Sequence, residues 1–174
     1  MLIHLRKGTP SDLPFLRRML YEAAYWRGVE RPEFEKGLST TELSKLLANW
    51  GREDDTAVLA EEAATPVGAV WYRLWDDANH SYGYVSSAVP ELAIGVLEQY
   101  RRKGVGRRLL EHLLREGSLS GYAQLSLSVE RDNPALVLYE SLGFKIIGAV
   151  GNAYTMIANT DGTMTPRGTQ SPSG

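Results

Sequence analysis

The chain has 174 residues, of which 43% are hydrophobic and 23% charged. These values are ordinary for a globular protein, and the length suits one domain with a complete core. The net charge of −2 argues against a nucleic-acid partner, and the absence of cysteine excludes disulfides, thiolate metal sites and a cysteine acyl intermediate. No apolar run approaches the roughly 20 residues of a membrane span, and the first residues do not resemble a secretion signal, so a cytoplasmic protein without a membrane partner is expected.

Hydrophobic periodicity predicts strands and helices in the first half of the chain. Thr9, Pro10 and Asp12 form the pattern of a helix N-terminus, with Ser11 as the alternative capping residue. Residues 56–62 and 67–75 have the pattern of an antiparallel hairpin. The other predicted elements are a strand over residues 2–7, a helix after the capping residue and a helix over 41–50. The first of these helices has apolar residues at helical spacing, namely Leu13, Leu16, Leu20, Ala23 and Ala24.

The second half alternates strands with helices, which is typical of parallel strands joined by crossovers. The predicted elements are a short edge segment at 82–85, strands at 91–97 and 122–129, helices at 105–116 and 134–142, and strands at 144–148 and 154–159. Residues 160–174 are rich in Thr, Gly, Pro and Ser and read as a polar tail. We therefore expect one α/β domain over residues 1–159, with a mixed sheet.

The most informative segment is a basic turn at residues 101–108, which apart from Val105 consists of Arg, Lys and Gly. Gly104 and Gly106 allow a ligand close to the backbone, and the free amides of the helix start favour an anion, most often a phosphate. Leu109 stands where a dinucleotide-binding motif needs its third glycine, and no Gly-Lys-Ser/Thr follows, which excludes two common nucleotide motifs. A solvated basic helix start is the alternative.

Three segments share the order and spacing of a known superfamily. Arg101-x-x-Gly104-x-Gly106 resembles the pyrophosphate-binding motif of the GCN5-related N-acetyltransferases (GNAT). The strand Ile94-Gly95-Val96 precedes it at the same distance, and Asn133-Pro134-Ala135 with Leu138–Phe144 resembles the downstream signature. The resemblance implies the GNAT fold, a mixed sheet of six to seven strands flanked by helices, and acetyl-CoA as co-substrate without a metal.

The resemblance also implies where acetyl-CoA binds. The backbone of Ile94, Gly95 and Val96 would hold the pantetheine arm as an additional strand partner, and Asn133 would touch that arm. The pyrophosphate would be bound at the glycine turn, by Arg101, Arg102, Lys103, Gly104, Val105, Gly106 and Arg107.

Tyr139 matches the usual general acid of the superfamily, which protonates the departing thiolate; packing between helix and sheet is its alternative role. Glu91, at the start of the strand before the turn, is the candidate general base, and a solvated strand end or a backbone carbonyl with water is the alternative. His4, His80 and His112 are expected to be structural or exposed. Without a cysteine or a serine nucleophile motif, direct attack by the amine is expected.

We expect four aromatic residues to line the acceptor site: Tyr25, Trp26, Trp50 and Tyr84. Glu22, Asp54 or Asp55 could attract a cation beside them, and ordinary core packing is the alternative for the aromatic residues. We expect a small-molecule amine as acceptor. The alternatives are a protein N-terminus or lysine, or a non-catalytic module that senses acyl-CoA. A homodimer is left open.

Overall fold

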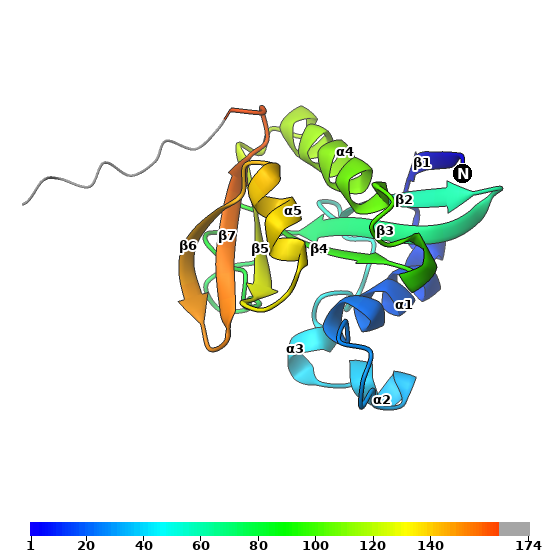
Figure 1. The fold of residues 1–174 in the computed structure, drawn as a ribbon. Helices are drawn as coiled ribbons and strands as arrows, with labels where there is room; N and C mark the ends of the chain where they lie inside the picture. The colour runs from blue at the N-terminus through cyan, green and yellow to red at the C-terminus, as the bar shows by residue number, and fades with distance from the viewer. Residues whose placement is uncertain (164–174) are drawn as a thin grey trace, which may run out of the picture.

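A seven-stranded mixed sheet runs through the molecule in the order β1-β2-β3-β4-β5-β7-β6 (Figure 1). This computed structural model describes residues 1–163. The strands are β1 (Ile3–Lys7), β2 (Thr56–Glu62), β3 (Thr65–Arg73), β4 (Glu91–Val96), β5 (Gln124–Glu130), β6 (Lys145–Val150) and β7 (Ala153–Asn159). Neighbouring strands are antiparallel except β4 and β5, so the predicted mixed sheet of six to seven strands is confirmed.

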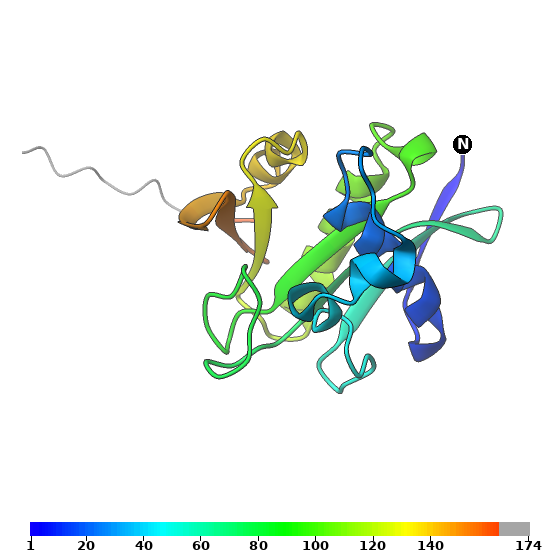
Figure 2. The ribbon, with the colours of Figure 1, turned by 90° about the horizontal axis from the view of Figure 1, so that it is seen from below.

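Helices cover both faces of this sheet. They are α1 (Leu13–Ala24), α2 (Phe34–Leu38), α3 (Thr41–Ser44), α4 (Val105–Leu119) and α5 (Ala135–Ser141). Figures 1 and 2 show α4 and α5 on one face and α1 to α3 on the other. As predicted, Thr9 precedes the first helical turn, a 3-10 turn at Pro10–Asp12, and its N–H donates to the Asp12 carboxylate at 2.8 Å. Within residues 1–163, no helix is long and apolar enough to cross a membrane.

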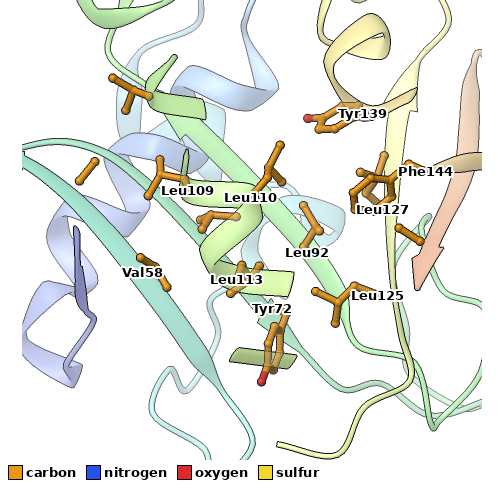
Figure 3. Packing of buried hydrophobic residues seen from close by; sticks show 14 of the residues in the cluster. Val58, Tyr72, Leu92, Leu109, Leu110, Leu113, Leu125, Leu127, Tyr139 and Phe144 are labelled. Atoms are coloured by element: carbon orange, nitrogen blue, oxygen red, sulfur yellow. The ribbon is translucent and has the colours of Figure 1, made fainter. Parts of the chain in front are cut away.

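Successive residues of a strand face opposite sides of the sheet, and the two faces build two cores. Beneath α4, Leu109, Leu110 and Leu113 pack against side chains of β2 to β5, and Tyr139 of α5 lies beside Phe144 at the end of this core (Figure 3). The other core joins α1 to Ala69 and Trp71 of β3. The central strands are therefore covered on both faces, and their ends remain the places where a site can open.

Helix α1 crosses β4 at close range because Gly95 has no side chain. A Cβ at this position would lie 2.3 Å from the carbonyl oxygen of Met19, which is far inside van der Waals contact. Gly95 thus fixes how α1 sits on β4 and places the C-terminal half of that helix beside the strand.

Strands β4 and β5 form a parallel pair at a single position, Glu91 with Ser126. Beyond this position the two strands diverge (Figure 2). Leu97 N–H donates to the carbonyl of Val67 on the β3 side at 2.9 Å. Because backbone groups alternate sides along a strand, those of Ile94 and Val96 point toward β5, into the gap.

The helix predicted over residues 41–50 is wrong in length: α3 covers only Thr41–Ser44 and is followed by turns. The buried guanidinium of Arg73 explains the difference, because Nη1 donates to the carbonyls of Lys45 and Ala48 at 2.8 and 2.9 Å. A continuing helix would need those acceptors for its own bonds. The short helix α2 lies in a region where no element was predicted.

The edge segment predicted at residues 82–85 is not a strand. Tyr82 and Gly83 form a turn, and Tyr84 and Val85 have no regular structure. The N–H of Gly83 donates to the side chain of Glu91 instead of to a neighbouring strand. At the other end of the chain, Thr160 is buried and donates through Oγ1 to the carbonyl of Tyr122 at 2.6 Å. Residues 164–174 of the predicted tail lie outside the described residues.

Candidate active site

A cleft of about 1310 Å³ opens where β4 and β5 diverge. Its walls come from the end of α1, α3, β4, the turn before α4, β5, α5 and the β6–β7 turn. The residues assigned to acetyl-CoA that line it are Ile94, Gly95, Val96, Arg101, Arg102, Gly104, Gly106, Arg107 and Asn133. Lys103 and Val105 are not part of the lining, and the side chain of Val105 is buried in the core beneath α4.

The turn before α4 presents a row of amides. Gly104 precedes the helix with a φ of +83°, in the left-handed region that glycine tolerates, and Arg102 also has a positive φ of +59°. The helix ladder begins with Arg108 N–H, which donates to the carbonyl of Gly104 at 3.1 Å. The amides of Val105, Gly106 and Arg107 precede that bond, as the first amides of a helix do. They form the positive end of the α4 dipole.

Gly106 is not required by the protein's own packing. A Cβ there would lie 3.5 Å from the nearest atom, on Leu138, which is ordinary contact. Its φ is not positive, so the backbone conformation does not demand glycine either. Because Gly106 has no side chain, a ligand in the cleft can approach the backbone at this position.

Arg101 fastens the turn to two other elements. Its Nε donates to the carbonyl of Val96 at 2.9 Å, and its Nη2 donates to Glu22 of α1 at 3.0 Å. The same carboxylate oxygen of Glu22 also accepts from Arg31 at 3.1 Å. Glu22 is therefore neutralised by two arginines, and it is not the free carboxylate that could attract a cation.

Glu91 is buried at the base of the cleft, with 6% of its surface exposed. Its Oε2 accepts from the N–H of Gly83 at 2.7 Å, whereas Oε1 is buried and accepts from no donor among residues 1–163. Burial raises the pKa of Glu91 to about 7. The hydrogen bond from Gly83, the nearby polar side chains of Ser81 and Trp75 and the imidazole of His80 oppose this rise. The carboxyl group is thus poised to exchange a proton near neutral pH.

Tyr139 lies on α5 in the wall of the same cleft. Its ring packs edge-on against Phe144, with 5.9 Å between ring centroids (Figure 3). Burial raises the pKa of its hydroxyl to about 12, so the phenol keeps its proton at neutral pH.

The four aromatic residues assigned to the acceptor are not brought together. Tyr25 and Trp26 line the cleft, but Trp50 and Tyr84 do not. Trp50 lies 5.5 Å from the guanidinium of Arg73, measured to its ring centroid, and Tyr84 stacks on His80 with 4.3 Å between ring centroids.

The two aspartates considered as cation sites also have other partners. Asp55 pairs with buried Arg73 at 2.7 Å, and Asp54 accepts from the hydroxyl of Tyr122 at 3.4 Å. Neither residue lines the cleft.

An ion-pair bridge between the two walls of the cleft was not foreseen. Arg27, after α1, pairs with Glu130 at the end of β5 and with Asp132 beyond it, at 2.5 and 2.8 Å. Its guanidinium also lies 4.3 Å from the ring centroid of Trp26. Arg27 and Glu130 are 103 residues apart in the sequence, and no local pattern connects them, so only the folded chain reveals the pair. Within the described residues, no group of three or more potential ligands could hold a metal ion.

Comparison with known proteins agrees with this geometry. The sequence model of the "Acetyltransferase (GNAT) family" matches residues 23–144, and the chain belongs to that family. The structure resembles the PaiA N-acetyltransferase of Thermoplasma acidophilum in complex with coenzyme A. The TM-score is 0.66 at 21% identity, over 91% of this chain and 99% of that one, and such a likeness concerns the fold.

Sequence relatives match over parts of their length. The chain is 52% identical over 52 residues to the [ribosomal protein bS18]-alanine N-acetyltransferase of Escherichia coli K12, which is 29% of this chain and 35% of that protein. The chain thus matches about a third of the length of that relative. It is also 30% identical over 108 residues, 61% of either protein, to N-alpha-acetyltransferase 50 of Danio rerio.

Proposed function

We propose that this chain transfers the acetyl group of acetyl-CoA to a primary amine, by direct attack within a ternary complex. One observation carries the proposal: the cleft along β4 contains both a buried phenol and a buried carboxyl group, of which one oxygen has no hydrogen-bond partner among residues 1–163. Both groups have the protonation behaviour that the two proton transfers of this reaction need.

The donor would lie along β4 and the turn before α4. The backbone groups of Ile94 and the N–H of Val96 point into the gap and match the amides of a pantetheine arm, which would pair as an additional strand. The carbonyl of Val96 already accepts from Arg101. The amides of Val105, Gly106 and Arg107 would bind the pyrophosphate, with the α4 dipole adding to the attraction. Asn133 lines the same wall. Family membership and the coenzyme A complex of a related fold support this placement.

The chemistry then divides between two residues. Glu91, as a carboxylate, accepts the proton that the ammonium must lose before its nitrogen attacks the thioester carbonyl. A carbon–nitrogen bond forms, and the nitrogen then carries one proton more than the amide retains. As the carbon–sulfur bond breaks, Tyr139 gives its proton to the departing sulfur and the nitrogen releases its extra proton to solvent. Re-protonation of Tyr139 from solvent and loss of the proton from Glu91 restore the starting state. Neither step needs a metal or a covalent enzyme intermediate.

The acceptor that this cleft favours is a peptide N-terminus. The expectation of a small amine rests on an aromatic wall around the acceptor, but Trp50 and Tyr84 do not line the cleft. The cleft instead reaches from α3 to the β6–β7 turn, which leaves room for an extended chain. The names of the two sequence relatives, an alanine and an N-alpha acetyltransferase, support the same choice.

Charge pairing in the cleft indicates where the ammonium would bind. The lining carboxylates Glu22, Glu42 and Glu130 each form an ion pair with a basic residue. Glu91 lines the cleft without such a partner among residues 1–163, and it keeps one oxygen unpaired. The positively charged amine of the acceptor would therefore bind next to Glu91.

The test is release of free CoA from acetyl-CoA, measured with a thiol reagent. The protein has no cysteine, so the reagent reports CoA alone. The panel contains peptides that begin with alanine, methionine or serine, the same peptides with a blocked N-terminus, and small amines. We expect release with free peptides and none with blocked ones. Binding of acetyl-CoA without release across the panel would overturn the proposal in favour of a non-catalytic acyl-CoA-binding module.

A further inference from the structure

The loop residue Gly83 forms hydrogen bonds to both Glu91 of β4 and Ser126 of β5. The N–H of Gly83 donates to Glu91 Oε2 at 2.7 Å, and the hydroxyl of Ser126 donates to the carbonyl of Gly83, also at 2.7 Å. Ser126 is the residue that pairs with Glu91 where β4 and β5 meet. The two strands at the base of the cleft thus each form a side-chain hydrogen bond to the backbone of Gly83, β4 to its N–H and β5 to its carbonyl.

The contact is too close for any residue other than glycine. A Cβ at position 83 would lie 2.4 Å from Glu91 Oε2, 2.8 Å from Glu91 Cδ and 2.9 Å from the carbonyl carbon of Leu127. The φ of Gly83 is not positive, so the reason for glycine is this approach and not the backbone conformation. Position 83 is shaped to let an N–H reach the carboxylate.

This arrangement is buried throughout. Ser126 is fully buried, and the neighbouring Ser81 is 8% exposed. A buried hydroxyl that donates to a loop carbonyl restrains the position of the loop relative to the sheet. Breaking this bond would leave two buried polar groups without a hydrogen-bond partner, which costs free energy. Glu91 accepts one hydrogen bond of good geometry from this assembly, and its second oxygen accepts none from residues 1–163. The polar side chains of Ser81 and Trp75 lie near the carboxyl group and favour its charged form without such a bond.

We propose that Gly83 and Ser126 are positioning residues, which anchor Glu91 through Oε2 and leave Oε1 for the acceptor amine or for a water molecule that carries its proton. The assignment of Glu91 as the base rests on the proposed function. The anchoring itself rests on the two hydrogen bonds and on the contact that excludes a side chain at position 83.

The anchor has a consequence for the protonation of Glu91. A hydrogen bond donated to a carboxylate favours its charged form, so the bond from Gly83 works against the desolvation that raises the pKa. The other charged or ionisable groups nearby are His80 on the same loop, Lys45, which reaches the His80 carbonyl from beyond α3, and Arg73 opposite Glu91 on β3, already paired with Asp55. Loosening Gly83 should therefore raise the pKa of Glu91 further.

The test measures that pKa directly, by titrating the 13C-labelled side-chain carboxyl of Glu91 in nuclear magnetic resonance spectra. Ser126→Ala removes the bond to Gly83 and leaves Glu91 intact. We expect the Glu91 pKa to rise by at least about half a unit, since one charge-assisted hydrogen bond is weakened. This readout needs no acceptor, so it does not depend on the proposed function.

Thr160→Ala is the matched control. Thr160 is also a buried hydroxyl that donates to a backbone carbonyl, at 2.6 Å, and it does not line the cleft. It should lower thermal stability to a similar extent and leave the Glu91 pKa where it is. An equal shift in both variants would mean a general loosening of the fold and would overturn the positioning role, as would an unchanged pKa in Ser126→Ala.

A kinetic arm uses an alanine-initiated peptide and acetyl-CoA as probes. We expect Ser126→Ala to lower kcat about tenfold with the KM for acetyl-CoA unchanged, because misplacing a base affects the proton transfer and not donor binding. Wild-type kcat in Ser126→Ala would contradict the positioning role. Wild-type kcat in Glu91→Gln would instead remove the base assignment, and with it the proposed mechanism, without touching the hydrogen bonds that anchor the side chain.

Discussion

Arg73 on β3 pairs in register with Glu91 on β4, and both side chains are buried. The two residues differ in how far neighbouring groups compensate their charge. Arg73 pairs with Asp55 and donates to two backbone carbonyls, so its charge is compensated. The side chain of Glu91 accepts a single hydrogen bond from residues 1–163, which leave one of its oxygens unpaired. A fully compensated buried charge maintains the fold, whereas an incompletely compensated one at a cleft weakens the fold and is a candidate for chemistry.

The largest expected effect concerns the compensated charge. Asp55→Ala leaves the guanidinium of Arg73 buried without its carboxylate, and removing one partner of a buried pair typically costs about 3–5 kcal/mol. Denaturation by urea measures the loss. Asp54→Ala, at the neighbouring position, should change stability by less than about 1 kcal/mol. If the two variants lose equal stability, the Arg73 pair is not what maintains this region.

Removing the uncompensated charge should have the opposite sign. The folded pKa of Glu91 is about 7 against an ordinary value of 4.5, so the folded state binds the proton more tightly and stability falls as pH rises through that interval. Glu91→Gln should therefore be more stable than the wild type at pH 8, by up to about 3 kcal/mol, and similar to it at pH 4. Urea denaturation at both values checks this. A variant less stable than the wild type at pH 8 would contradict the contrast with Arg73.

Tyr139→Phe should lower kcat about a hundredfold, because a general acid of this kind contributes at least that much. Phenylalanine keeps the ring that packs on Phe144, so acetyl-CoA binding and stability should be retained. The matched control is Tyr72→Phe, since Tyr72 is also a buried tyrosine but lies outside the cleft, and its hydroxyl has no hydrogen-bond partner among residues 1–163. Equal turnover in the two variants would exclude Tyr139 as the acid.

The smallest effect is expected at the turn before α4. Gly106→Ala places a methyl group where the chain has room, and alanine is the better helix former, so thermal stability should not fall. The same methyl group would obstruct a bound pyrophosphate, and we expect about tenfold weaker binding of acetyl-CoA, a change of about 1.4 kcal/mol. Calorimetric titration measures it, with Gly148→Ala as control because a Cβ there meets nothing within 4 Å. Unaltered affinity would place the pyrophosphate elsewhere.

The sequence was a good guide to the donor side of the cleft because that side is built from contiguous backbone. A strand, a glycine turn and a helix are encoded by neighbouring residues, and residues 91–119 fold as their periodicity predicts. The seven strands and helices α1, α4 and α5 follow from the same local signals, whereas α2, the length of α3 and the turn at residues 82–83 do not. The family resemblance, carried by short motifs in this part of the chain, is likewise confirmed.

The acceptor side was harder to predict because distant segments build it. Trp50 is an aromatic residue of the kind common in binding sites, but it lies beside the guanidinium of Arg73. Arg73 also donates to a backbone carbonyl beyond α3, which limits the length of that helix. Glu22 is neutralised by Arg31 and Arg101, which follow it in the sequence at distances that no local pattern connects. Glu91 is distinguished from the other carboxylates of the cleft only in the folded structure, where those carboxylates form ion pairs and Glu91 forms none within residues 1–163.

The measurement that tests the central claim most directly is the pH dependence of acetyl transfer to an alanine-initiated peptide, in the wild type and in Glu91→Gln. Because the base acts as a carboxylate and its pKa is about 7, the wild-type kcat should rise as pH increases from 5.5 and level off above about 8. In Glu91→Gln the rate should be lower throughout, and this rise should be absent. A variant that keeps the wild-type rate and the same rise near pH 7 would contradict the account.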